Sequence, residues 1–183
     1  GYTAAVRILL RDSRVAEKGT KNWSMADVSG KETTHRVAIA AGKIHIGREA
    51  FNLLEQGKLP KGDPLAMAEI AGIQAAKQTP ALIPLCHPIS LNRVLIHSVR
   101  RPEEQAVELY CVAEIAEKTG VEMEALTGLS IALLTIWDLV KPVNPALEIG
   151  AMRLVYKSGG KKGTWVHPDG LPDEVVEILA SIE

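Results

Sequence analysis

The sequence predicts an α+β sandwich in which helices cover an antiparallel sheet. Apolar residues recur three or four positions apart through residues 119–143, which is typical of a core helix. Two strand-like segments, 89–99 and 106–117, come directly before it, and another, 151–157, follows. The order helix, strand, strand, helix, strand is that of the split βαβ arrangement, so we expect a ferredoxin-like fold.

The composition excludes several classes of protein. A chain of 183 residues is long enough for one domain with a substantial core. Its net charge of -1 and pI near 6.6 disfavour nucleic-acid binding, which requires a broad excess of Lys and Arg. The two cysteines, Cys86 and Cys111, lack the spacing of a zinc site or a disulfide framework. No membrane span or secretory signal is recognised, so a soluble cytoplasmic protein is expected.

The first half of the chain contains one predicted strand and two predicted helices. Residues 1–24 show a short apolar alternation that fits an edge strand or an arm, and no function is assigned to them. Residues 37–46 read as a strand, with a break at Gly42 left open. A helix over 48–56 should end at Gly57.

A second helix should begin at Asp63 and Pro64, since the aspartate can cap it and proline suits its first position. Its many alanines and Gly72 predict close packing on a sheet or on another subunit. Lys61 stands just before this helix, where an anion such as phosphate is favoured, although an exposed loop lysine is the plainer interpretation.

Prolines punctuate residues 80–88, which argues against a helix and holds His87 in a stiff, extended backbone. Cys86 and His87 should therefore point to opposite sides rather than pair. In the following hairpin, alternation makes Cys111 a core residue and leaves one face of the strands uncovered.

The central helix carries the strongest candidate chemistry. Asp138 and Lys141 are three residues apart, so a helix places them one turn from each other, as a site or as an ordinary surface ion pair. Glu124 lies fourteen residues before Asp138, about 21 Å along an unbroken helix. A site that uses both requires either a helix that begins late or a second copy of the chain.

A glycine- and lysine-rich stretch, residues 157–163, follows the last strand. Glycines let backbone amides close around an anion and lysines neutralise it, although a solvated turn has the same composition. Together with Lys61, Lys141 and His87, this stretch suits a highly anionic small molecule that undergoes proton transfer. A nucleotide triphosphate is the expected ligand class.

Several strings occur in the order found in one enzyme family: MADVSGKETTHR, KGD, AGIQAAK, LIPLCHP, KTGVEMEALT, WDLVK and KSGGKKG. On these strings the chain resembles the cyclic pyranopterin monophosphate synthases, the molybdenum cofactor biosynthesis protein C family. The resemblance covers residues 25–163 and leaves an N-terminal arm, 1–24, and a C-terminal tail, 164–183.

The resemblance implies conversion of 3′,8-cyclo-7,8-dihydroguanosine triphosphate to cyclic pyranopterin monophosphate with release of diphosphate. It implies no metal and no cofactor, and a homohexamer built as a trimer of dimers with sites at the dimer interface. The implied catalytic pair is Asp138 and Lys141. The implied substrate-binding residues are Leu85, Cys86, His87, Met123, Glu124, Lys61, Lys157 and Arg36.

One position departs from the family pattern, because Pro142 follows Lys141 where alanine is usual. Proline disfavours an α conformation at Lys141, so the helix should end there. This departure and the unmatched flanks leave open a nucleotide-binding or scaffold homologue that is catalytically impaired. The helix rich in small residues leaves open a purely structural oligomer.

Overall fold

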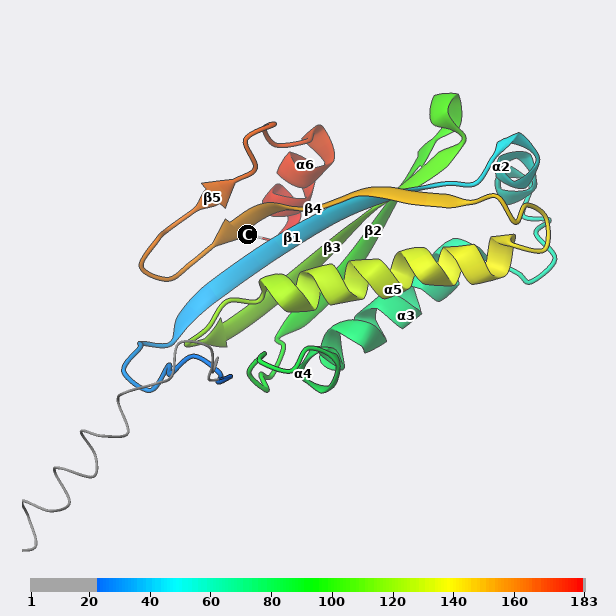
Figure 1. Cartoon of the computed structure of the whole chain (residues 1–183). Helices are drawn as coiled ribbons and strands as arrows, with labels where there is room; N and C mark the ends of the chain where they lie inside the picture. The colour runs from blue at the N-terminus through cyan, green and yellow to red at the C-terminus, as the bar shows by residue number, and fades with distance from the viewer. Residues whose placement is uncertain (1–22, 183) are drawn as a thin grey trace, which may run out of the picture.

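A twisted antiparallel sheet with the strand order β2-β3-β1-β4-β5 forms the centre of the protein (Figure 1). The computed structural model describes residues 23–182, so the predicted alternation near the N-terminus lies outside the described residues. The strands are β1 (Thr34–His45), β2 (Arg93–Arg101), β3 (Ala106–Glu117), β4 (Glu148–Ser158) and β5 (Trp165–Val166). The first four have the order and directions of a ferredoxin-like sheet, which confirms the predicted fold class.

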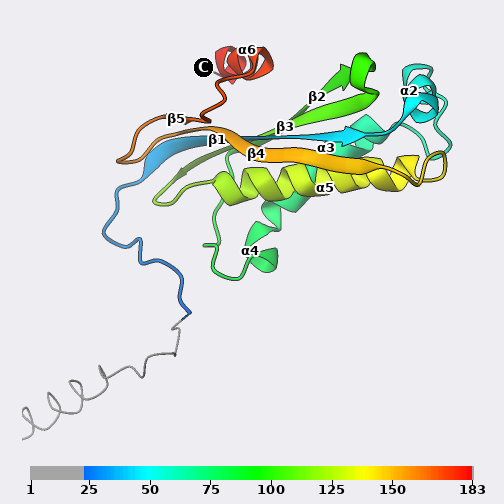
Figure 2. The same ribbon diagram turned by 45° about the horizontal axis from the view of Figure 1, so that its top comes forward.

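Helices lie on both faces of this sheet. They are α2 (Arg48–Glu55), α3 (Pro64–Lys77), α4 (Thr79–Leu82), α5 (Glu122–Val140) and α6 (Asp173–Ile182), with a 3₁₀ turn, η1, at Pro102–Glu104. Figure 2 shows α3, α4 and α5 on one side of the sheet and α6 on the other. The described residues thus form three layers rather than two.

The larger core lies between the sheet and the α3–α5 layer. Alternate residues of β3, including Leu109 and Cys111, pack there against Leu129 and Leu133 of α5. Cys111 is a core residue, as predicted. By length and a mean hydropathy of 1.5, α5 qualifies as a candidate membrane span, but half of that stretch is buried inside this protein. Its apolar character follows from its place in the core.

The second core corrects the prediction that one face of the hairpin is uncovered. Tyr110 and Val112 of β3 point away from α5 and are buried with Val175 and Ile178 of α6. The C-terminal tail supplies this cover. Its helix α6 packs on β3 through contacts between residues more than 60 positions apart in the chain.

Helix ends mostly follow the predicted signals. The side chain of Asp63 accepts hydrogen bonds from the amides of Leu65 and Ala66, and Pro64 opens α3. Residues 80–88 were predicted to contain no helix, which is wrong for one turn, because α4 spans Thr79–Leu82. Pro80 is tolerated there since the amides of a first turn need no intrahelical partner.

The strands differ from prediction mainly at their ends. β1 runs through Gly42 without a break against β3, although its register with β4 shifts there. β2 begins at Arg93 rather than Ile89. Just before it, the side-chain oxygen of Asn92 accepts a hydrogen bond from the Ala116 amide of β3, in place of a backbone pair. β4 begins three residues earlier than the predicted strand, at Glu148.

The small residues of α3 pack within the protomer. A Cβ at Gly72 would lie 3.0 Å from the carbonyl oxygen of Gly128 in α5, and one at Gly128 would lie 2.9 Å from that of Gly72. This close approach brings α3 and the loop before it against α5. It therefore sets the position of Lys61 relative to the end of α5.

Candidate functional site

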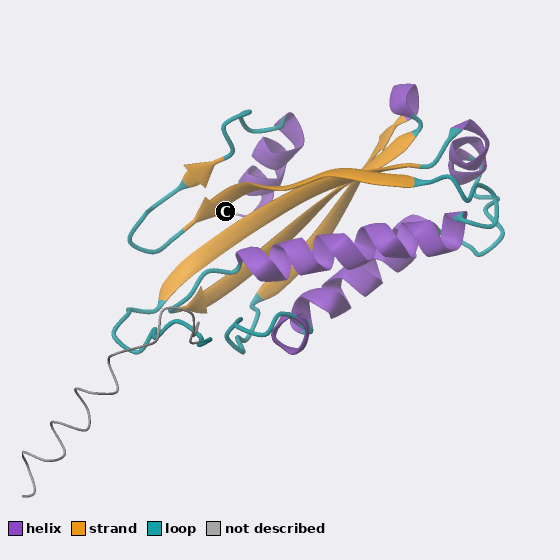
Figure 3. Cartoon of the chain, viewed as in Figure 1, coloured by secondary structure: helices purple, strands orange, loops and turns teal. Residues whose placement is uncertain are grey.

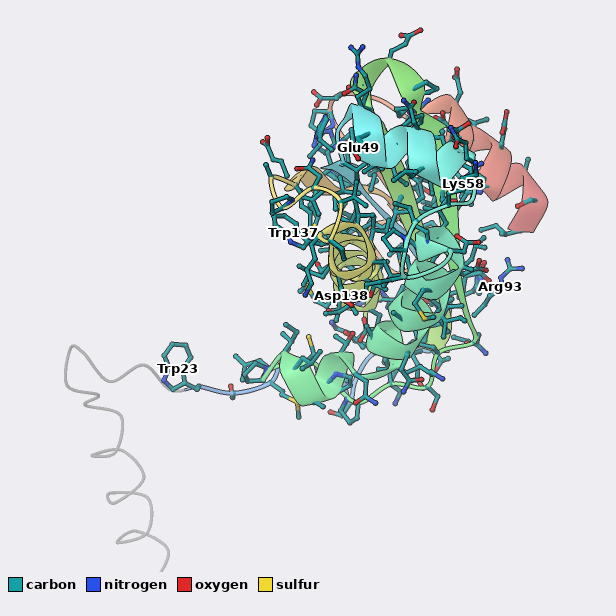
Figure 4. The ribbon with its side chains drawn as sticks, turned by 90° about the vertical axis from the view of Figure 1, so that its right-hand side faces the viewer. Trp23, Glu49, Lys58, Arg93, Trp137 and Asp138 are labelled. Carbon is teal, nitrogen blue, oxygen red and sulfur yellow. The ribbon has the colours of Figure 1, made fainter. Side chains whose placement is uncertain are left out.

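An aspartate held between two lysines lies at the C-terminal end of α5. Lys141 Nζ is 2.9 Å from Asp138 Oδ1, and Lys61 Nζ is 3.0 Å from Asp138 Oδ2. Lys61 also donates to the Asp138 carbonyl oxygen at 3.2 Å. Figure 4 looks along α5 from this end and labels Asp138 beside it. Lys61, Asp138 and Lys141 are called the C-terminal cluster below.

The electrostatics of this cluster favour an ionised aspartate. Hydrogen bonds from Lys141 and then Lys61 lower the pKa of Asp138 below its ordinary value, and both positive charges add to the effect. All three side chains are about half exposed. The two ammonium groups therefore remain open to an anionic ligand arriving from solvent.

Lys141 is the C-cap of α5, so the predicted helix end is confirmed. The expectation that Pro142 would move Lys141 out of the α conformation is wrong, since its φ and ψ are -53° and -28°. The Lys141 amide donates to the Trp137 carbonyl, and the next amides beyond the proline donate to Val140. Pro142 thus falls where its missing amide leaves the helix intact.

A buried carboxyl marks the opposite end of α5. Glu124 is 3% exposed in the first turn of the helix. Burial raises its pKa, and the negative charge of Glu122 raises it further, while its own backbone amide acts in the other direction. Glu124 is accordingly biased toward the protonated form, in which it can donate a hydrogen bond.

The Leu85–His87 segment lies near this carboxyl. Burial raises the pKa of Cys86, and so does the negative charge of Glu124, which places the two side chains within electrostatic reach. His87 Nε2 lies 2.8 Å from the Ala26 carbonyl oxygen and joins the segment to the chain before β1. Leu85 and Met123 are both exposed beside these groups.

A cavity of about 680 Å³ opens between the start of α5, the beginning of β1 and the glycine-rich loop. Arg36 and Lys157 line it together with Lys161. Lys157 Nζ lies 3.1 Å from Glu122 Oε1, and Arg36 donates to the carbonyl oxygens of Glu117 and Lys118. Positively charged side chains therefore line the cavity, and two of them, Arg36 and Lys157, are held in place by these contacts.

The glycines of the loop are required by close packing on Arg36. Gly159 and Gly160 have φ of +97° and +75°, which disfavour other residues. A Cβ at Gly160 would lie 2.6 Å from Arg36 Nη1, and one at Gly159 would overlap the His35 carbonyl oxygen. The loop backbone thus lies directly against β1.

The predicted site residues form two groups in one protomer, not one. Glu124 and Asp138 lie on the same unbroken helix, about 21 Å apart at 1.5 Å per residue. The C-terminal cluster is at one end. Two sets of residues lie toward the other end and are together called the N-terminal cluster. Arg36 and Lys157 line the cavity, whereas Leu85, Cys86, His87, Met123 and Glu124 lie outside its lining.

Around the cavity the structure adds Glu122 and Lys31 to Lys161 and Lys162 of the predicted lysine-rich stretch. The sequence assigns no role to Glu122, because nothing local distinguishes it from other acidic residues in a first helical turn. Its partner Lys157 is set by the pairing of β4 with β1, in which Lys157 lies opposite Ala38. Lys161 and Lys162 could be recognised from the sequence, because several lysines occur there among glycines.

Comparison with known proteins identifies the family of the chain. A sequence model described as "MoaC family" matches residues 25–160. Three similar curated proteins are each named cyclic pyranopterin monophosphate synthase. The one from Novosphingobium aromaticivorans is 49% identical over 141 residues, covering 77% of this chain and 88% of the relative.

The synthase from Thermomicrobium roseum is 43% identical over 145 residues, covering 79% of this chain and 87% of the relative. The one from a Nocardioides species is 44% identical over 159 residues, covering 86% and 96%. Such identity over nearly the whole length of the relatives, together with the matching family model, establishes the relationship. The chain belongs to the MoaC family.

Proposed function

We propose that the protein is a cyclic pyranopterin monophosphate synthase of molybdenum cofactor biosynthesis. It would convert (8S)-3′,8-cyclo-7,8-dihydroguanosine 5′-triphosphate to cyclic pyranopterin monophosphate and diphosphate, as a phosphorus–oxygen lyase. Family membership and the names of the relatives support this assignment. The structural observation that carries it is the carboxylate of Asp138 held between Lys61 and Lys141.

The N-terminal cluster supplies the binding groups in this proposal. Closing a cyclic phosphate needs a ribose hydroxyl to attack the innermost phosphorus while diphosphate leaves, so the phosphates must be held in line. Arg36, Lys157 and the glycine-rich loop would hold them. Leu85, Cys86, His87, Met123 and Glu124 would bind the ring system, with the Glu124 carboxyl available as a hydrogen-bond donor.

The C-terminal cluster supplies proton transfer. Lys141 and Asp138 are the proposed catalytic pair, with Lys61 as a second ammonium group on the same carboxylate. A lysine that exchanges protons near neutral pH must lose part of the stabilisation of its charged form. Lys61 and Lys141 both contact the Asp138 carboxylate, so both ammonium groups lie where a proton would be transferred.

The active site is proposed to combine the C-terminal cluster of one protomer with the N-terminal cluster of another. A distance of about 21 Å along α5 is too long for one small substrate to bridge. The surface of the helical layer also carries exposed apolar side chains, which is typical of interfaces between subunits. They include Met67, Ile70, Leu82, Leu85, Met123 and Leu134.

We therefore propose a homohexamer built as a trimer of dimers, with the sites at the dimer interface. Residues 25–163 would form the synthase domain, and the location would be the cytoplasm. No metal or cofactor is assigned to the reaction. The oligomeric state in solution and complementation between inactive variants test this assembly.

A catalytically impaired homologue is the second candidate, because Pro142 replaces a usual alanine. The geometry favours the active enzyme, since Lys141 retains its α conformation and lies 2.9 Å from Asp138. An impaired homologue would bind the substrate without converting it.

The deciding experiment incubates purified protein with the cyclic dihydroguanosine triphosphate. Release of diphosphate and formation of the pterin product are followed together by chromatography. The synthase should form both in equal amounts. A folded, assembled protein that forms neither contradicts the assignment, and substrate binding without turnover identifies the impaired homologue.

A further inference from the structure

The glycine-rich loop is anchored on its carboxyl side by elements that the family match does not include. The match ends at residue 160, within the loop. β5 then returns along β4, with Val166 opposite Tyr156 and Trp165 opposite Lys157. On its other side Lys157 lies opposite Ala38 of β1. Figure 3 shows the loop as the turn between β4 and β5.

The chain after β5 stays bound to the sheet on its way to α6. The His167 amide donates to the Val155 carbonyl oxygen at 3.0 Å, which extends the contact with β4. α6 then packs on the sheet through Val175 and Ile178, which are 0% and 5% exposed. Their buried neighbours include Ile39 of β1 and Val155 of β4, two paired strands of the sheet.

An ion pair joins the first turn of α6 to the end of β2. Arg101 Nη2 lies 2.6 Å from Glu174 Oε1 and 3.4 Å from Glu108 Oε1. Burial alone would raise the pKa of Glu174, but its backbone amide and Arg101 hold that pKa below its ordinary value. Glu174 is therefore charged at neutral pH, when the pair stabilises the docked helix.

We propose that β5 and α6 act as a clasp that holds the glycine-rich loop in the conformation that binds the diphosphate portion of the substrate. Val175 and Glu174 are positioning residues in this proposal, since they act through Lys157 and the loop. The proposal rests on the proposed function for the identity of the substrate. The clasp itself concerns binding of a diphosphate group.

The physical reason lies in the conformational freedom of the loop. Gly159, Gly160 and Gly163 all have positive φ, and Lys161 and Lys162 are exposed between them. A free glycine-rich segment samples many conformations and loses that freedom when it closes on an anion. Anchoring both ends restricts the loop before binding, which improves affinity without adding a contact to the ligand.

The test compares two neighbouring substitutions in the full-length protein. Val175→Asp places a charge in the buried face of α6, whereas Val176→Asp places it at a side chain that is 52% exposed. Affinity for inorganic diphosphate is measured by calorimetry, and tryptic cleavage after Lys161 and Lys162 reports on the loop. For the Val175 variant we expect roughly tenfold weaker binding and faster cleavage, with the Val176 variant unchanged.

A turnover assay adds a readout that a loss of overall stability would not give. Val175→Asp should raise KM for the triphosphate by the same factor and leave kcat within about twofold, since the C-terminal cluster is untouched. If this variant does not fold, Glu174→Gln is compared with Glu177→Gln, an exposed glutamate on the same helix. Weaker diphosphate binding in the Glu174 variant alone supports the clasp.

Unchanged diphosphate affinity in a folded variant whose α6 is released, as judged by hydrogen exchange, overturns the proposal. Failure of the proposed function has a different signature. In that case the unaltered protein forms no pterin product, while diphosphate binding and loop cleavage still report on the clasp.

Discussion

Lys61 and Asp138 are 77 residues apart in the chain, yet Lys61 Nζ lies 3.0 Å from Asp138 Oδ2. The contact depends on α3 and α5, which pack closely at Gly72 and Gly128. Lys61 comes two residues before Asp63, the N-cap of α3, so the packing of α3 on α5 places Lys61 at the end of α5. A carboxylate that would otherwise have one lysine partner at i+3 thereby acquires two.

Replacing Lys61 should reduce turnover without unfolding the protein. Its side chain and that of Asp138 are 42% and 52% exposed, and exposed ion pairs contribute little to stability. We expect Lys61→Ala to lower kcat/KM by about 10²- to 10³-fold, because it removes one of the two ammonium groups that hold the catalytic carboxylate of Asp138. Lys58→Ala, in the same exposed loop (Figure 4), is the control and should retain full activity. Equal activity of both variants would remove Lys61 from the site.

Pro142→Ala should change turnover by less than about threefold, since Lys141 already has helical dihedral angles and pairs with Asp138 at 2.9 Å. Steady-state kinetics of the purified variant checks this. A large increase from a nearly inactive unaltered protein would instead identify the proline as the cause of impairment.

Glu124→Gln should stabilise the protein at neutral pH. A raised pKa means that the folded state holds a proton that the unfolded state has released. Stability therefore falls as pH rises from the ordinary glutamate value of 4.5 through the raised value. Thermal unfolding should show a higher Tm for the variant at pH 7 and little difference near pH 4. Glu69→Gln, at an exposed position of α3, is the control, and an identical pH dependence in both variants would contradict the assignment.

Gly128→Ala should destabilise the packing of α3 on α5. The added methyl group would lie 2.9 Å from both the Gly72 carbonyl oxygen and Cys111 Sγ, and such overpacking costs about 1–3 kcal/mol. Urea unfolding measures the loss of stability. Gly150→Ala, which meets no atom within 4 Å, should unfold at the same urea concentration as the unaltered protein.

Sequence reasoning predicted the features that depend on local order. The start of α3 at Asp63 and the apolar stripe of α5 follow from signals within one or two helical turns. The pairing of Lys157 with Glu122 instead depends on the register of β4 against β1, and local alternation does not determine which strands meet. The cover of the second sheet face by α6 depends on tertiary contact in the same way.

The division of the site between the two ends of α5 leads to a complementation experiment. Lys141→Ala disables the C-terminal cluster and Lys157→Ala disables the N-terminal cluster, so each variant alone should lose activity by orders of magnitude while still assembling. A mixed dimer of the two variants has one site with both defects and one site with none, provided each site takes one cluster from each protomer. Co-expression with separable tags should therefore restore about a quarter of the activity in a random mixture, because half of the dimers are mixed and each holds one intact site. Lys141→Ala combined with Lys157→Ala in one chain, mixed with itself, is the inactive control. If each site lay within one protomer, every site in the mixture would retain a defect and no activity would return.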